Sequence, residues 1–489
     1  MQLERTGIAP VGRKSAHRMK VDSILFVKVQ RSHGAVQVLK ALTGPVRTSL
    51  LNNPIRLVPL GFLGAIVLGT LLLSLPISRT DPSAGGFMPA VFTAVSAVCV
   101  TGLITVDTPT YWTPIGQGFI LLLIQVGGFG IMTLSSLLAL LVRKHLGLRT
   151  QLVAASETQA MNLGDVRRVL IFVAKTTFAI EGAIALVLTG RFWIMNPADP
   201  GGALWGGIFH SISAFNNAGF ALYSDSLISH AHDPWIMIPL GIAVILGGLG
   251  FPVIHELLRR SGSKKCWSVH TLLTVWGTVG LLVLGAVVLG LFEWNRPETL
   301  GELTPGGKSL GVLGLSVFPR TAGFNNIDYG QASSESLLVT EILMFIGGGS
   351  AGTAGGIKIS TFLVLAFALW SEARGHEQLT VGRRAIGTRI QRQALSVALL
   401  GVGAVATGTL ALLVLTEHSL EEVLFECVSA FATVGVSMGI TADLNTSAQW
   451  VIIGLMFIGR VGIVSAAAAL ALRHRRLLFK LPEEQPVIG

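Results

Sequence analysis

The chain has 489 residues, of which 51% are hydrophobic and only 13% are charged, and its mean hydropathy is +0.67. Soluble globular chains carry about 25% charged residues. The composition therefore excludes an ordinary soluble protein and indicates many membrane spans. The net charge of +10 could suggest a nucleic-acid partner, but most of the Lys and Arg residues fall in five clusters separated by long apolar stretches. By the positive-inside rule these clusters and both termini are expected on the cytoplasmic side, and no nucleic-acid partner is expected.

Between consecutive basic clusters the same order of segments recurs four times. An apolar run long enough to cross about 30 Å of hydrocarbon comes first, and a shorter apolar stretch follows that fits a re-entrant helix. A short glycine-containing segment and a second long apolar run complete each unit. In chain order these three apolar segments are expected at Leu57–Ile77, Phe87–Val98 and Ile115–Val142; Val169–Leu188, Ala203–Phe215 and Pro234–Leu258; Val269–Phe292, Ser309–Phe318 and Leu337–Leu369; and Leu395–Leu415, Leu420–Phe431 and Trp450–Leu472.

This recurrence predicts an all-α membrane protein with eight spans and four re-entrant pore helices. Four M1–P–M2 (helix–pore loop–helix) repeats would surround one central pore in a pseudo-fourfold arrangement. The predicted parts are a cytoplasmic N-terminal arm at 1–56, repeats at 57–150, 151–265, 266–385 and 386–475, and a cytoplasmic C-terminal tail at 476–489.

Each unit carries one glycine just after its short apolar stretch. Glycine adopts positive φ without a Cβ clash, so neighbouring carbonyl groups can point toward a common axis. Four such loops would form rings of carbonyl oxygens that replace the hydration shell of a potassium ion. The predicted potassium-binding filter comprises Thr101, Gly102, Ala218, Gly219, Ala322, Gly323, Val434 and Gly435.

Polar residues near these glycines have supporting or capping interpretations. Asn217, Asn325 and Glu426 are expected to stiffen the filter loops through hydrogen bonds rather than to bind the ion. Each glycine is followed within eight residues by an acid, and these acids either raise the local cation concentration at an outer mouth or cap loops; they are Asp107, Asp225, Asp328 and Asp443. These two alternatives remain open on sequence grounds.

The four glycine segments resemble those of the Trk/Ktr/HKT superfamily of potassium transporters. The matching stretches are Ala97–Asp107, Ser213–Phe220, Phe318–Asn325 and Glu426–Gly439. The resemblance implies four M1–P–M2 repeats around one pore and a single well-formed ion site. In the plant branch of the superfamily, a serine in the first loop accompanies sodium preference. Gly102 stands at that position here, which favours potassium.

Within the superfamily, two further features are similar to the KtrB branch. Residues 1–56 contain no predicted span, whereas TrkH-like members usually begin with two additional ones, and the chain ends in PEEQPVIG. This similarity implies potassium uptake across the cytoplasmic (inner) membrane by a homodimer. It also implies a cytosolic KtrA-like ring that binds ATP or ADP, and sodium as an activator. No cofactor is expected in this chain itself.

The third return segment contains six glycines among the ten residues 347–356. Each glycine costs a helix about 1 kcal/mol relative to alanine, and loose backbone within a membrane must face protein or a water-filled cavity. We therefore expect a gating loop at 347–358 across the conduction path, as the superfamily resemblance also implies. The alternative is close helix packing through small residues. The predicted gate residues are Gly347, Gly348, Gly349, Gly352, Gly355, Gly356, Lys358 and Arg460.

Lys358 and Arg460 are cations inside predicted spans, where charge is costly and usually functional. Both are expected to present positive charge below the filter, and either could bond loop carbonyl groups and hold the gate closed. The alternative for Arg460 is a structural ion pair with a buried acid such as Glu341 or Glu426.

No Walker motif, phosphorylatable aspartate motif or catalytic constellation is present, so we do not expect an enzyme. The rival functions are a TrkH-like or sodium-permeable relative and an inverted-repeat secondary transporter. The second requires oppositely oriented halves, whereas the four units here have the same orientation.

Overall fold

The computed structural model describes residues 54–81, 86–144, 166–259, 267–376, 378–381 and 384–462. Chain contacts divide the protein into two units, Met1–Leu57 and Val58–Gly489, and the architecture below concerns the second. The predicted arm up to residue 53 and the predicted tail 476–489 lie outside the described residues. Within the described residues, the first helix begins at Pro54, three residues before the predicted start of the first repeat.

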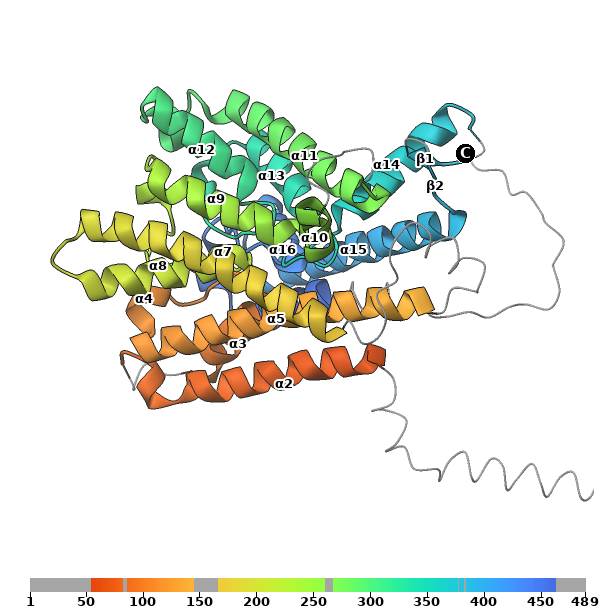
Figure 1. Ribbon diagram of the computed structural model, residues 1–489. Helices are drawn as coiled ribbons and strands as arrows, with labels where there is room; N and C mark the ends of the chain where they lie inside the picture. The colour runs from red at the N-terminus through yellow and green to blue at the C-terminus, as the bar shows by residue number, and fades with distance from the viewer. Residues whose placement is uncertain are drawn as a thin grey trace, which may run out of the picture. The chain divides into compact units, whose positions relative to one another are not determined.

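The first half of the described chain is almost entirely helical (Figure 1). Its helices and short turns are α2 (Pro54–Ser74), η1 (Pro76–Ser78), α3 (Phe87–Cys99), α4 (Thr108–Tyr111), α5 (Pro114–Lys144), α7 (Val166–Met195), α8 (Pro200–Phe215), η3 (Ile228–His230), α9 (Pro234–Leu249) and α10 (Phe251–Arg259). Helices α3 and α5 pack together, and α7 runs alongside α8.

The second half continues in the same manner. Its elements are α11 (Val269–Glu293), the π-turn η5 (Pro297–Gly301), α12 (Pro305–Val317), η6 (Tyr329–Gln331), α13 (Ser334–Phe345), α14 (Ile359–Ala373), β1 (Thr380–Val381), β2 (Arg384–Ala385), α15 (Thr388–Leu415), α16 (Leu420–Ala432), η7 (Ile440–Asp443), α17 (Thr446–Phe457) and the π-turn η8 (Ile458–Gly462). The two strands form a small antiparallel hairpin in which Thr380 pairs with Ala385.

Helix starts follow the local sequence. The Asp199 carboxylate accepts a hydrogen bond from the Gly202 N–H at the start of α8, and Ser419 forms a capping box with Glu422 at the start of α16. These side chains satisfy N–H groups that have no partner within their helices. Several helices also carry proline in the first turn, where no amide hydrogen is needed.

Fewer helices than expected meet a simple length test for spanning. Within the described residues, Leu170–Met195, Val269–Glu293 and Thr388–Leu415 are long and apolar enough to cross a bilayer, and the bent pair α9–α10 is a fourth if it counts as one span. The other four of the eight predicted spans do not meet this test, because one is divided and three are short in their described apolar parts. The third return segment is divided into α13 and α14. The described apolar parts of the remaining three are shorter, at Val58–Ser74, Pro114–Gly130 and Thr446–Gly462.

The second return segment, expected as one span, is sharply bent. Helix α9 ends at Leu249, α10 begins at Phe251, and the two axes differ by 98°. The residue between them, Gly250, has φ +90° and lies against the Ser350 carbonyl group, so a Cβ there would overlap backbone. The break between α9 and α10 therefore lies where the segment at Ser350 approaches closely.

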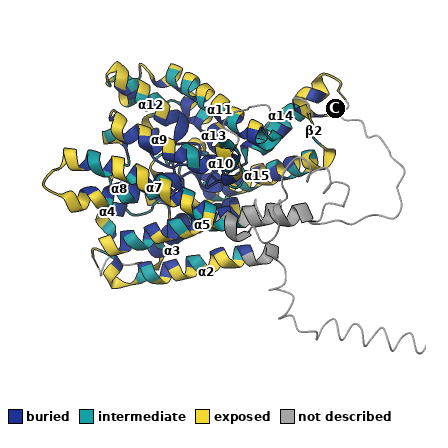
Figure 2. Ribbon diagram, viewed as in Figure 1, coloured by how far each residue is buried: buried dark blue, intermediate teal, exposed yellow. Residues whose placement is uncertain are grey.

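The long helices expose large apolar side chains along one side and bury the other (Figure 2). Leu186 in α7, Leu291 in α11 and Val414 in α15 are 76%, 77% and 79% exposed. Apolar surface on this scale suits contact with lipid rather than water. The buried core gathers instead around the shorter helices α3, α8, α12 and α16, which lead into the candidate site.

Candidate site: four glycine loops and the loop beside them

Four short segments follow α3, α8, α12 and α16 and share an unusual backbone. We call residues 100–103, 217–220, 321–324 and 433–436 glycine loops 1 to 4. Their glycines, Gly102, Gly219, Gly323 and Gly435, have φ of +97°, +72°, +77° and +99°. The residues two positions earlier, Val100, Asn217, Thr321 and Thr433, also have positive φ. Non-glycine residues rarely adopt this region, so the four loops share a demanding conformation rather than a generic turn.

The four glycines lie next to one another in a closed ring. A Cβ built on any one of them would lie between 2.7 and 3.2 Å from the Cα of a neighbouring glycine in the ring. It would also meet a carbonyl oxygen of the next loop. In order around the ring, the carbonyl groups met are those of Ala218, Ala322, Val434 and Thr101. Only hydrogen fits at the glycine positions, and the structure brings all eight predicted filter residues together.

Three of the loops are held by their own preceding helix through the same backbone bond. The N–H groups of Thr101, Ala218 and Val434 each donate to the carbonyl group five residues earlier, at 2.8 Å in every case. Loop 3 differs, because its Ala322 N–H donates to the Phe318 carbonyl group at 2.9 Å, four residues earlier. The third loop is therefore wound more tightly than the others.

Serine hydroxyls brace the same three loops, a feature that sequence reasoning missed. The Ser96 and Ser429 Oγ atoms each accept from the N–H of their loop's glycine, at 3.1 Å. Ser213 Oγ donates to the Phe220 carbonyl group at 2.7 Å. Val317 occupies the corresponding position before loop 3. A serine six residues before the glycine in three of four loops was the available signal.

The predicted supports Asn325 and Glu426 bond residues that come after the glycine loops in the chain. Asn325 joins the segments that follow loops 2, 3 and 4: its N–H donates to Ser226 Oγ at 3.1 Å, and its side-chain amide donates to the Ser437 carbonyl group at 3.5 Å. The fully buried Glu426 carboxylate accepts from the Ser437 and Thr441 hydroxyls. Both side chains therefore stabilise the segments that follow the glycine loops.

The acids after the glycines make local hydrogen bonds. Asp107 accepts from Thr110 Oγ1 and Ser224 Oγ, both at 2.7 Å. Asp225 accepts from the Ser229 N–H at 2.8 Å. These contacts favour the loop-capping alternative, and the Ser224 contact also ties the segment after loop 1 to the segment after loop 2.

The segment at residues 346–358, hereafter the 346–358 loop, connects α13 with α14 and lies directly against three glycine loops. A Cβ on Gly347 would lie 3.3 Å from Thr321 Cγ2 of loop 3, and one on Gly355 would overlap Thr433 of loop 4. Thr353 contacts Asn217 of loop 2. The Gly349 N–H donates to the Gly248 carbonyl group of α9 at 2.7 Å.

The buried Arg460 and the partly buried Lys358 both bond carbonyl groups of this loop. The Arg460 guanidinium donates to the Thr353 carbonyl group, and the Lys358 ammonium donates to the carbonyl groups of Ala354 and Gly355. Arg460 is only 2% exposed. Among the described residues it forms no ion pair, so the alternative pairing with Glu341 or Glu426 is not what the structure contains.

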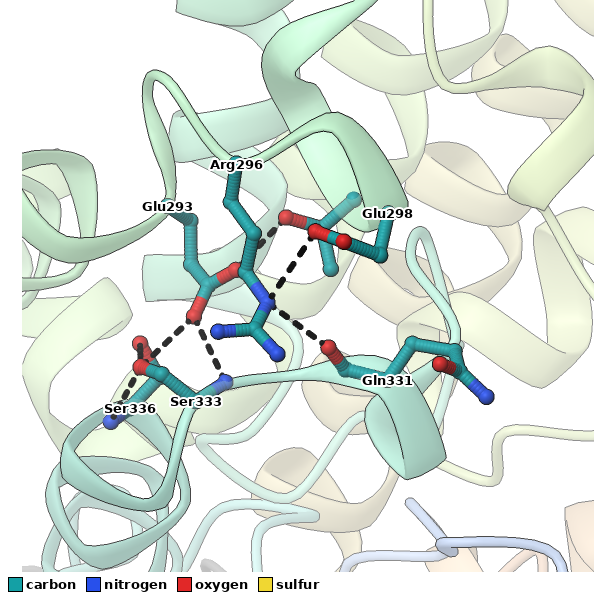
Figure 3. Close-up of polar contacts among 7 residues, drawn as sticks. Glu293, Arg296, Glu298, Gln331, Ser333 and Ser336 are labelled. Atoms are coloured by element: carbon teal, nitrogen blue, oxygen red, sulfur yellow. Dashed lines mark hydrogen bonds and ion pairs between the residues drawn. The ribbon is translucent and has the colours of Figure 1, made fainter.

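A second polar cluster joins the end of α11 to the start of α13 (Figure 3). The buried Glu293 carboxylate accepts from Thr299 Oγ1 at 2.6 Å, and from the Ser333 N–H and Oγ at 3.1 and 3.0 Å. Nearby, Arg296 donates to the Gln331 carbonyl group at 2.9 Å and lies 3.6 Å from the Glu298 carboxylate. Because donors surround the Glu293 carboxylate, the cluster stabilises the start of α13 and is not a metal site; we call Glu293, Thr299 and Ser333 the clasp. The part of the chain that the structure describes holds no metal-binding group of His, Cys, Asp and Glu.

Comparisons with known proteins fit this geometry. The family described as "TrkH: Cation transport protein" matches residues 65–476. The chain is 37% identical over 410 residues to Ktr system potassium uptake protein B of Bacillus subtilis, which covers 84% of this chain and 91% of that protein. It is 38% identical over 438 residues to the protein of the same name from Vibrio alginolyticus, with coverage of 89% and 94%.

Two further similarities extend the comparison. The chain is 33% identical over 449 residues to the potassium/sodium uptake protein NtpJ of Enterococcus hirae, covering 89% of this chain and 97% of that protein. Its structure resembles the crystal structure of the potassium transporter TrkH from Vibrio parahaemolyticus with a TM-score of 0.64, covering 83% of each chain at 18% identity. That likeness shows a shared, mostly helical fold.

Proposed function

Because the chain belongs to the TrkH family of cation transport proteins, we propose that it is the potassium-translocating subunit of a Ktr-type uptake system. Membership makes it a multi-pass membrane transporter rather than an enzyme. The relatives named as potassium uptake proteins are similar over nearly their whole length, which supports potassium as the transported ion.

The closed ring of four glycines is the observation that carries the proposal. The carbonyl groups of Thr101, Ala218, Ala322 and Val434 adjoin these glycines in ring order, so they are the proposed ligands of a dehydrated potassium ion. Helices α3, α8, α12 and α16 each end at a glycine loop. Their partial negative C-terminal ends favour a cation at the ring.

The proposed architecture is four M1–P–M2 repeats around this ring, with α3, α8, α12 and α16 as the pore helices. The shared backbone of the four loops supports the repeat, since positive φ recurs at the glycine and two residues before it. The basic clusters support cytoplasmic termini in the cytoplasmic membrane. The inside-negative potential then contributes about 2.3 kcal/mol per charge per 100 mV to uptake.

The 346–358 loop is the proposed gate. It lies against three glycine loops, and two cations, the buried Arg460 and the partly buried Lys358, bond its carbonyl groups. A fixed positive charge beside the ion path opposes potassium passage. Movement of the loop away from the ring, with loss of the Arg460 bond, would open the path.

The proposed assembly is a homodimer that docks a cytosolic KtrA-like ring binding ATP or ADP, with sodium as an activator. The word "system" in the relatives' names supports a partner subunit. Arg374, Arg384, Arg389 and Arg392 near the β1–β2 hairpin offer a basic surface for such a partner.

A sodium-permeable relative is the second candidate, because one similar protein is named for potassium and sodium uptake. Flux assays on the purified chain in liposomes, with potassium, rubidium, sodium and lithium, separate the two. Selective potassium and rubidium flux is expected, whereas equal sodium flux favours the second candidate and no cation flux contradicts both. Copurification with a cytosolic ring protein, with and without ATP or ADP, tests the proposed partner.

A further inference from the structure

Thr353 is the residue of the 346–358 loop with the most varied contacts, and its side chain is fully buried. Its N–H donates to the Gly247 carbonyl group at 3.1 Å, and its carbonyl group accepts from Arg460. The backbone of this one residue therefore links α9 to the π-turn η8.

The Thr353 hydroxyl points at a glycine loop instead. Its Oγ1 lies 2.9 Å from Asn217 Oδ1 and 3.2 Å from the Phe215 carbonyl oxygen. Both are acceptors, so the hydroxyl donates to one or shares its proton between them. Asn217 has φ +59° and stands two residues before Gly219 in loop 2.

Asn217 passes the contact on to the neighbouring loop. Its side-chain Nδ2 lies 3.4 Å from Thr321 Oγ1, and Thr321 occupies the same position in loop 3 that Asn217 occupies in loop 2. A chain of side-chain hydrogen bonds thus runs from the 346–358 loop through loop 2 to loop 3.

Loops 1 and 4 offer no matching link among the described residues. Val100 has no side-chain donor or acceptor, and Thr433 Oγ1 has no hydrogen-bond partner in the part of the chain that is described. Loop 3 also lacks the serine brace of its neighbours, since Val317 stands there. The Asn217 contact therefore reaches the loop that lacks a serine brace of its own.

We propose that Thr353 is a positioning residue that couples the 346–358 loop to glycine loops 2 and 3, so that this loop sets ion selectivity as well as access. The proposal rests on the proposed function. While Arg460 holds the loop, the Thr353 hydroxyl fixes the Asn217 amide and, through it, Thr321. When the loop withdraws, Asn217 loses this partner and the ring at loops 2 and 3 relaxes.

The test compares selectivity rather than total transport. Purified full-length variants in liposomes are assayed for the ratio of rubidium to sodium flux. One lost hydrogen bond corresponds to roughly a three- to tenfold change in such a ratio. Thr353→Val removes the hydroxyl and should lower the ratio by that amount, whereas Thr353→Ser retains the hydroxyl and should stay near wild type.

Thr177→Val is the matched control. Thr177 in α7 is fully buried, and its Oγ1 has no hydrogen-bond partner among the described residues, so this variant should leave the ratio unchanged. Asn217→Gly removes the other partner of the same hydrogen bond. Glycine tolerates the positive φ of this position and lacks the amide. This variant should lower the ratio by a similar factor, and combining it with Thr353→Val should add nothing further.

Two results separate the inference from the function on which it rests. Absent cation flux in the wild type contradicts the proposed function itself. Normal wild-type flux with an unchanged ratio in folded Thr353→Val and in Asn217→Gly overturns the coupling, because the 346–358 loop would then act as a barrier alone. If Thr353→Val does not fold, the Asn217→Gly ratio decides the matter.

Discussion

The four glycine loops and the 346–358 loop are both non-helical backbone inside a membrane protein, yet they are held in different ways. The glycine loops bond mainly to the helix that precedes them, through N–H groups such as those of Thr101 and Val434. The 346–358 loop has internal bonds, such as that from the Gly347 N–H to the Ile357 carbonyl group at 2.9 Å, but it also bonds to distant chain. Thr353 contacts Asn217, 136 residues away, and Arg460, 107 residues away.

This difference supports the proposal that the glycine ring is a permanent element and the 346–358 loop a movable one. Bonds within a helix and its own loop survive as long as that helix does. Bonds between distant segments are lost when those segments shift relative to one another. A loop that is held by such bonds is therefore suited to switching between two conformations. The glycine ring can therefore keep its main-chain bonds while the 346–358 loop moves.

The largest effect is expected from a substitution in the ring. Gly323→Ala places a Cβ on a residue with φ +77°, against the Val434 carbonyl oxygen and the neighbouring glycines. The positive φ alone costs about 1–2 kcal/mol, and the overlap with backbone adds to it. We expect loss of selective potassium flux in liposomes.

Gly454→Ala is the control, because a Cβ on Gly454 of α17 meets nothing within 4 Å. It should transport like the wild type. Retained selectivity in Gly323→Ala would contradict the ring as the ion site.

The next effect concerns the 346–358 loop. Arg460→Gln removes the buried charge and weakens the bond to the Thr353 carbonyl group. Charged hydrogen bonds contribute about 1.5–3 kcal/mol, so we expect potassium flux to rise by about tenfold, with selectivity reduced but not abolished. Uptake into potassium-uptake-deficient cells, corrected for expression, measures it.

Lys308→Gln serves as the control for this variant, since Lys308 is an exposed cation that donates to the Trp294 carbonyl group far along the chain from the loop. Unchanged or reduced uptake in Arg460→Gln would show that the arginine does not restrain the path.

A smaller effect is expected from the serine braces. Ser96→Ala and Ser429→Ala each remove the acceptor of a glycine N–H, and the loss should lower the rubidium-to-sodium flux ratio by roughly threefold. Ser309→Ala, on the exposed start of α12, should not change it. Equal ratios in all three variants would mean that main-chain bonds alone hold the loops.

The smallest effect is expected at the clasp of Figure 3, which fixes the start of α13. Glu293→Gln places amide hydrogens against the donors of Thr299 and Ser333, and should lower thermal stability in detergent by roughly 1–3 kcal/mol. Glu298→Gln affects only a partly exposed pair, and should cost at most about 1 kcal/mol. Equal melting temperatures for the two variants would argue against the clasp.

The sequence by itself determined the local features of this protein. The loops were predicted from the glycines that follow the short apolar helices, because tolerance of positive φ is a property of glycine itself. These glycines are Gly102, Gly219, Gly323 and Gly435. Six glycines in 347–356 predicted broken helix for the same kind of reason. Charge clusters and apolar lengths predicted a membrane protein, which the family match confirms.

Only the tertiary structure decided which distant groups meet. It paired Arg460 with the Thr353 carbonyl group instead of an acid, and it set the bend of the second return segment at Gly250, where Ser350 approaches. It also joined Thr353 to Asn217. Backbone preferences act within a few residues and can be read along the chain, whereas these partners lie on different helices and are chosen by packing.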